Sequence, residues 1–259
     1  MEFHSKKNWS PFGILGILLP AVALFLLVAF PPHTLDLAVS KLFWRNGHWL
    51  GQGVAVAELV GHELIKVIPA GIALYYVWLA WRFGKAGDSL NRRRAVFVIV
   101  GLLLALFAVW WLKRTTGVYC PWSTVPFGGE QAMLNPTWHW SRVSGNCWPA
   151  GHSGTGFGLF VLYFAWRSVD VHKARKWLWV ALLLGGFCSF LRITQGAHFL
   201  SHTLASLLID WLIAALLYRF WLYPWEVRAK SPSPSAPNTL EQEAQQRYSH
   251  GGCRALTSD

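Results

Sequence analysis

Three histidines and two cationic side chains are the residues of this chain whose types and spacing are best suited to chemistry: His152, His198, His202, Lys113 and Arg192. An imidazole can move a proton, and it forms a phosphohistidine when it attacks phosphorus. Lys and Arg bind phosphate oxygens, Arg with a planar fork of donors. Because these residues fall in three short segments, we expect a phosphate site that transfers a phosphoryl group.

Local spacing supports this interpretation. His198 and His202 are four residues apart and therefore share one face of a helix, and Arg192 precedes them across a glycine. His152 follows Gly151 at the expected start of a helix, where free N–H groups and the positive end of the helix dipole attract anions. Two alternatives remain open for the histidine pair, namely polar packing between helices and metal ligation, for which this spacing is also suitable.

The elements that must position these residues are membrane-spanning helices. The chain is 54% hydrophobic and contains 17 Trp, a composition typical of α-helical membrane proteins. A stretch of about 20 apolar residues is long enough to cross a bilayer. We therefore expect an all-α integral membrane protein with six transmembrane helices, near residues 13–30, 64–82, 95–112, 153–167, 176–193 and 200–222.

The basic residues predict how the chain is oriented. Most of the 23 Lys and Arg residues fall in the N-terminus, in 82–94, in 167–176 and after Tyr218, which marks these segments as cytoplasmic. Both termini are then cytoplasmic, and the active site faces the periplasm from a bacterial inner membrane. The net charge of +11 is explained as a topological signal, so we expect no nucleic-acid partner.

Composition also predicts the domain limits. We expect residues 1–225 to form the membrane domain and the Ser- and Pro-rich segment 226–259 to be a disordered cytoplasmic tail. Residues 33–63 are expected outside the membrane, where apolar residues at helical spacing predict an amphipathic helix around Leu35–Trp49.

In order and spacing, three motifs resemble those of the type 2 phosphatidic acid phosphatase superfamily, whose bacterial lipid-phosphatase branch consists of six-helix membrane enzymes. The family pattern is Lys-x6-Arg-Pro, then Pro-Ser-Gly-His, then Ser-Arg-x5-His-x3-Asp. This chain has Lys113-x6-Cys120-Pro121, Pro149-Ala150-Gly151-His152 and Leu191-Arg192-x5-His198-x3-His202. The resemblance covers roughly residues 60–222.

The resemblance implies a role for each matching residue. His198 is then the nucleophile and His152 the general acid. Lys113 and Arg192 bind the substrate phosphate, helped by main-chain N–H groups around Gly151. No metal or other cofactor is required on this interpretation, because the cations and the helix terminus neutralise the phosphate.

Three of the departures from the family pattern affect phosphate binding. Ala150 and Leu191 each replace a Ser and lose a hydrogen bond to phosphate. Cys120 replaces an Arg and removes one cationic side chain, which Arg114 or Arg142 would have to supply.

The fourth departure concerns the third catalytic candidate, His202, which replaces an Asp that orients the nucleophile and stabilises its positive charge. A neutral His202 can accept a hydrogen bond from His198, but it brings no negative charge. Other carboxylates are candidates for that role: Glu58, Glu63, Glu130 and the more deeply placed Asp210.

Cys120 and Cys147 bracket the predicted outer loop beside the first two motifs. An oxidising periplasm allows such cysteines to pair, so we predict a disulfide between them, with two free thiols as the alternative. Closing a loop of about 26 residues would stabilise the fold by ~3 kcal/mol on the chain-entropy model.

Together these features predict a lipid phosphatase, a hydrolase that acts on a lipid phosphate monoester or diphosphate through a phosphohistidine. Its partners would be that lipid and the bilayer, and the sequence specifies neither the lipid nor the oligomeric state. The alternatives are a lipid phosphotransferase, a metal- or haem-binding membrane protein using the three histidines, and an inactive relative that binds phospholipids.

Overall fold

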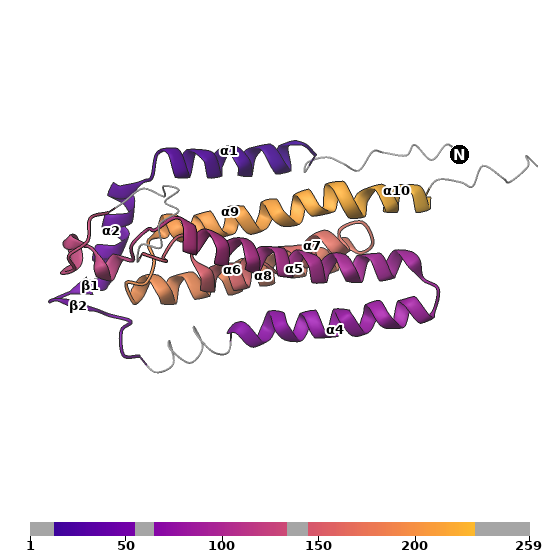
Figure 1. Ribbon diagram of the computed structural model, residues 1–259, viewed down its shortest axis with the longest axis horizontal. Helices are drawn as coiled ribbons and strands as arrows, with labels where there is room; N and C mark the ends of the chain where they lie inside the picture. Colours follow the sequence, from indigo (N-terminus) through magenta and orange to yellow (C-terminus); the bar gives the residue numbers. More distant parts are fainter. Residues whose placement is uncertain (1–12, 55–64, 134–144, 231–259) are drawn as a thin grey trace, which may run out of the picture.

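The computed structural model describes residues 13–54, 65–133 and 145–230, most of which are helical. The long helices lie side by side along one axis (Figure 1). The elements in chain order are α1 (Leu15–Ala29), α2 (His33–Phe43), β1 (Trp44–Arg45), β2 (His48–Trp49), α4 (Ile65–Lys85), α5 (Ser89–Thr115), the 3-10 turns η2 (Pro121–Ser123) and η3 (Val125–Phe127), α6 (Gly151–Phe157), α7 (Phe160–Trp166), α8 (Val171–Thr194), α9 (Leu200–Leu217), the π-helical turn η4 (Tyr218–Leu222) and α10 (Tyr223–Lys230).

Within the described residues, four helices are long and apolar enough to cross a membrane: Val67–Lys85, Ser89–Thr115, Val171–Thr194 and Leu200–Ala229. A fifth candidate is the pair α1 and α2, which passes the same test together but is bent by 82°. Large apolar side chains on the outside of the bundle, such as Leu103, Phe107 and Leu183, are exposed. Such a surface suits contact with lipid and indicates a membrane protein.

Helices occupy all six predicted apolar stretches, but they differ in length from the prediction. The fourth stretch is divided between α6 and α7, which have seven residues each. The amphipathic helix α2 ends at Phe43, because the antiparallel hairpin β1–β2 takes up the chain from Trp44 to Trp49. Four to five candidate spans therefore stand against the six that the sequence predicts.

The C-terminal boundary also differs from the prediction. Helix α10 continues to Lys230, past residue 226. Glu226 is buried and accepts hydrogen bonds from Arg94 at 2.9 Å, from Ser168 at 2.6 Å and from Tyr218 at 3.0 Å. The folded part therefore reaches beyond 225, because this carboxylate joins three helical segments, whereas the tail predicted after Lys230 lies outside the described residues.

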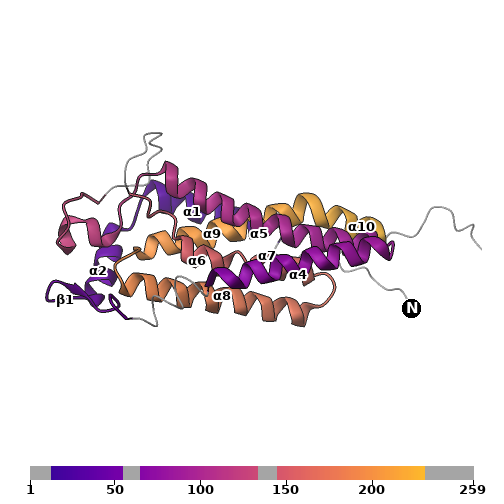
Figure 2. The same ribbon diagram turned by 60° about the horizontal axis from the view of Figure 1, so that its bottom comes forward.

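Short α6 lies at the centre of the bundle, against α8 (Figure 2). A Cβ atom on Gly156 would collide with the main chain of Gly185, and one on Gly185 would collide with the ring of Phe157. Only glycine permits so close an approach between the two helices. This contact fixes the start of α6, which carries His152, relative to α8, which carries Arg192.

Candidate active site

The three motifs meet at one end of the bundle, where α5 and α8 end and where α6 and α9 begin (Figures 1 and 2). Main-chain hydrogen bonds join the segments directly. The N–H of Ala150 donates to the carbonyl of His202 at 3.1 Å, and the N–H of Trp122 donates to the carbonyl of Gly196 at 3.0 Å. The first bond joins the segment before His152 to the start of α9. The second joins the loop after Lys113 to the turn between α8 and α9.

His198 lies at the centre of this end and is only 2% exposed. Its imidazole is close enough to Lys113, His202, Arg192 and His152 to sense their charges. Burial lowers the pKa of His198 well below its usual value of 6.5, and the positive charge of Lys113 lowers it further. The imidazole is therefore neutral at neutral pH, as a nucleophile must be.

A tight turn presents His198 between α8 and α9. Gly196 has φ of +71° in the left-handed region, and a Cβ atom at this position would collide with the indole of Trp49. Both the backbone conformation and the packing therefore require glycine. The hairpin that carries Trp49 supports the turn from outside the bundle, and the N–H of Gly51 donates to the carbonyl of Thr194 at 3.0 Å.

The two cationic candidates approach the site from different helices. Lys113 in α5 lies against the first residue of α6, because a Cβ atom on Gly151 would be 3.4 Å from its ammonium nitrogen. Arg192 in α8 donates through Nη1 to Gln195 at 2.8 Å, while its buried Nε has no partner among the described residues. Unused donors beside a buried imidazole suit the binding of an anion.

His202 occupies the position of the family's Asp but has different contacts. Its ring centroid is 5.9 Å from that of His198, and its imidazole forms a hydrogen bond with the main chain of Cys147. Nδ1 of His198 has no hydrogen-bond partner within the described part of the chain. His202 therefore does not hold His198 as the family's Asp would, and the structure shows no hydrogen bond between these two described histidines.

The predicted pairing of Cys120 with Cys147 is present, with Cα atoms 5.2 Å apart. The Cys147 sulfur also lies 3.3 Å from the carbonyl oxygen of Ala197, next to His198. The N–H of Cys147 donates to the carbonyl of Val118 at 3.0 Å. The disulfide thus fixes the segment after Lys113 against the turn that presents His198.

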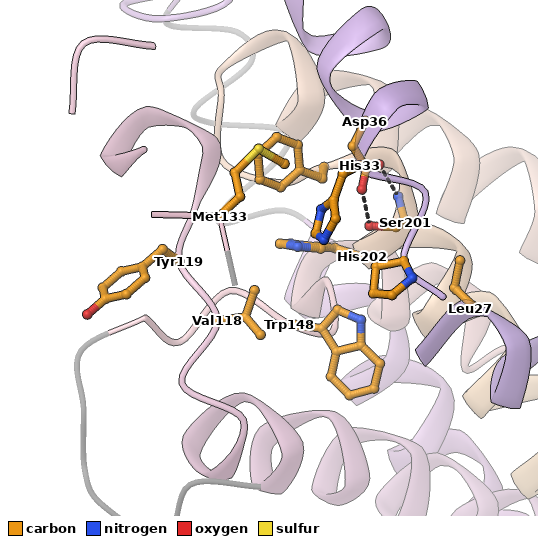
Figure 3. A pocket seen from close by; sticks show the side chains of 11 residues that line it. Leu27, His33, Asp36, Val118, Tyr119, Met133, Trp148, Ser201 and His202 are labelled. Atoms are coloured by element: carbon orange, nitrogen blue, oxygen red, sulfur yellow. Dashed lines mark hydrogen bonds between the residues drawn. The ribbon is translucent and has the colours of Figure 1, made fainter. Parts of the chain in front are cut away.

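Sequence reasoning missed Asp36 and His33, which lie one turn apart on α2. Asp36 is 2% exposed and accepts hydrogen bonds from the N–H of Ser201 at 2.9 Å and from its hydroxyl at 2.6 Å. His33 lies between Asp36 and His202 and senses the charges of both (Figure 3). A His and an Asp three residues apart at the start of an amphipathic segment were the available signal.

A small pocket of about 20 Å³ is lined by both residues together with Ser201, His202, Trp148 and others (Figure 3). Asp36 is therefore a buried carboxylate beside the site, although it comes from α2 and not from any of the three motifs. It hydrogen-bonds to the first turn of α9, immediately before His202.

The carboxylates and cations that the sequence offered as substitutes for the family's Asp and Arg lie in varied positions. Glu130 is exposed, and Asp210 is buried against Gly154, two turns beyond His202 on α9. Arg114 is exposed and lies over the ring of Trp110, with its guanidinium 4.8 Å from the ring centroid. Glu58, Glu63 and Arg142 lie outside the described residues.

Two cations and two further imidazoles lie near buried His198, an arrangement suited to binding a phosphate beside a neutral imidazole. Among the described residues, no group of three or more His, Cys, Asp or Glu side chains is arranged to hold a metal ion. All six site residues predicted from the motifs, including Gly151, lie at this one end of the bundle.

Comparison with known protein families gives a match. The family model described as the PAP2 superfamily matches residues 94–226, a range that contains all three motifs. No curated protein and no solved structure matches the chain.

Proposed function

This chain belongs to the PAP2 superfamily, and on that premise we propose that it is a lipid phosphatase that works through a phosphohistidine. The family generally comprises phosphatases, which supports hydrolysis of a phosphoric ester. The observation that carries the finer proposal is the position of buried His198 among Lys113, Arg192 and His152. The apolar helices of the bundle, which are long enough to cross a membrane, support a substrate that reaches the site from a bilayer.

In the first step, a nitrogen of neutral His198 attacks phosphorus, and the bond from phosphorus to the leaving oxygen breaks. Lys113 and Arg192 stabilise the negative charge on the remaining phosphoryl oxygens. His152 donates a proton to the departing oxygen, which leaves as an alcohol or as a lipid monophosphate. The N–P bond of the phosphohistidine is the product of this step.

In the second step, water attacks the phosphohistidine. His152, now neutral, accepts a proton from that water, and His198 leaves as the N–P bond breaks. Inorganic phosphate is released and both imidazoles return to their initial states. We place this site at the outer, periplasmic face of a bacterial inner membrane, because the basic loops 82–94 and 167–176 mark the other end as cytoplasmic.

The test is phosphate release by the purified protein in detergent, in the presence of excess chelator. The substrates are phosphatidic acid, phosphatidylglycerol phosphate, undecaprenyl diphosphate and a lipid A phosphate. Release by the wild type that disappears in His198→Ala supports the proposal, as does an acid-labile phosphate label that only the wild type acquires. Transfer of the label to a second lipid without free phosphate would instead show a phosphotransferase.

A further inference from the structure

A cavity of about 560 Å³ lies at the opposite end of the bundle from the histidines, between α4, α5, α7 and α8. Arg94 and Lys113 are 19 residues apart on α5, which is about 28 Å along a helix. The cavity is bordered by Arg94 and the candidate active site by Lys113. The two are therefore separate, and the proposed reaction makes no use of this cavity.

The walls of the cavity are apolar and aromatic. They include Ile72, Tyr75 and Leu79 of α4 and Trp177 of α8. Tyr76 of α4 accepts a hydrogen bond from the indole of Trp166 at 3.1 Å and so ties α4 to α7 beside the cavity. A volume of this size is in the range of small-molecule sites, about 300–1,000 Å³, and apolar walls suit a hydrocarbon chain.

Basic and polar groups border the same cavity. Arg94 is 7% exposed, and its Nε has no partner in the part of the chain that the structure describes, although its other nitrogens bond to Asn91 and Glu226. Lys173 borders the cavity from the first turn of α8, with its ammonium nitrogen 3.4 Å from the ring centroid of Trp166.

A second hollow, of about 440 Å³, shares Lys173 and Trp177 with the cavity and adds Lys176 and His172. Asp170 lies there too, but its carboxylate accepts the N–H of Lys173 and so caps α8. Lys173 and Lys176 thus place two basic side chains next to an apolar chamber, where they favour an anionic group.

From this arrangement we propose that the cavity binds an anionic phospholipid, with an acyl chain between α4 and α8 and the phosphate at Lys173 and Lys176. Charge complementarity selects an anionic headgroup over a zwitterionic one. On the topology predicted from the basic loops, this lipid belongs to the leaflet opposite the active site. It is a bound lipid and not the substrate.

Native mass spectrometry of the full chain in detergent tests the proposal, with phosphatidylglycerol and phosphatidylcholine of identical acyl chains as probes. Gly71 borders the cavity, and a Cβ atom there meets nothing within 4 Å. The leucine side chain of Gly71→Leu should therefore fill part of the cavity without a collision at its Cβ atom. Gly186→Leu is the matched control, because Gly186 is equally open but does not border the cavity.

We expect the wild type and Gly186→Leu to retain phosphatidylglycerol in preference to phosphatidylcholine and Gly71→Leu to lose it. Lys173→Gln, an exposed change, should reduce the preference about fivefold, the effect of one basic residue near an anionic lipid. Equal retention by Gly71→Leu and the wild type would overturn the proposal, as would equal binding of the two lipids by the wild type.

Discussion

The hydroxyl of Ser201 donates a hydrogen bond of 2.6 Å to the carboxylate of Asp36, across 165 residues of sequence. The N–H of Ser201 donates to the same carboxylate. Asp36 therefore caps the N-terminal end of α9 from another helix. Asp36 also lies near His33 and lines the same small pocket as His202, the residue at the position of the family's Asp.

We predict that Asp36→Asn lowers kcat at least about tenfold, because the site loses the buried carboxylate that lines the same small pocket as His202. The amide can still accept a hydrogen bond from Ser201, so the cap is largely kept. The decisive measurement is kcat of the double variant Asp36→Asn with His202→Asp, which restores a carboxylate at the family position. Recovery by the double variant supports an electrostatic role, whereas a loss that His202→Asp cannot repair would indicate capping alone. Glu130→Gln, at an exposed carboxylate, is the control and should not change kcat.

Removing the Lys113 ammonium should impair the transition state more than the fold. We expect Lys113→Ala to lower kcat/KM by about 10²–10³, the cost of losing one preorganised donor to a phosphoryl oxygen. Arg114→Ala is the matched control, because that side chain is exposed and lies over Trp110. Steady-state kinetics on the preferred lipid separate the two, and equal losses in both variants would count against a specific role for Lys113.

The lowered pKa of His198 predicts the acid side of the pH–rate profile. His198 attacks only when neutral, and its pKa lies below 6.5, so kcat/KM should not decline through loss of this nucleophile until the pH falls below 6.5. The free energy of unfolding should also decrease as the pH falls below about 6.5. The reason is that His198 of the unfolded chain binds a proton there, whereas His198 of the folded chain does not.

The cause of that shift can be checked with one variant. Burial is the main cause and the charge of Lys113 the next, so Lys113→Met should move the acid limb toward higher pH. Arg192, His152 and His202 also face His198 and remain in this variant. The profile of log kcat/KM against pH is the measurement, and an acid limb that stays in place would show that Lys113 does not influence His198.

Breaking the disulfide should loosen the site and lower stability together. We expect Cys120→Ser with Cys147→Ser to lower the free energy of unfolding by about 3 kcal/mol and to lower kcat, because the disulfide lies beside Ala197 and His198. The wild type treated with a reductant should behave in the same way. Unchanged melting temperature and rate in both preparations would refute a supporting role.

Gly196→Ala should lower the stability of the fold by more than the left-handed backbone conformation alone would cost. The conformation costs about 1–3 kcal/mol for a non-glycine residue, and the new Cβ atom also meets the indole of Trp49. Gly53→Ala is a matched control, since Gly53 has φ of +76° but nothing within 4 Å of its Cβ position. The difference between the two melting temperatures measures the effect of the contact with Trp49. No difference would mean that the hairpin moves aside and the contact costs no stability.

The sequence alone was sufficient for the helical class, for the family and for the set of motif residues that meet at one end of the bundle. Apolar runs of near-membrane length predict helices regardless of tertiary contacts. The spacing of the motifs placed Lys113, His152 and His198 at helix ends. Cys120 and Cys147 bracket the predicted outer loop, which predicted their disulfide, and the structure contains it. These features follow from local periodicity and from the order of segments along the chain.

Only the tertiary structure placed the carboxylate of Asp36 beside the candidate site and decided which helices are long enough to span a membrane. The carboxylate of Asp36 reaches α9 from 165 residues away, and no local pattern encodes a contact at that separation. The fourth predicted span is divided into α6 and α7, and α6 crosses α8 closely at Gly156 and Gly185, a contact between segments about 30 residues apart. Side-chain chemistry and periodicity are local properties of a sequence, whereas burial and charge pairing arise only when distant segments pack together.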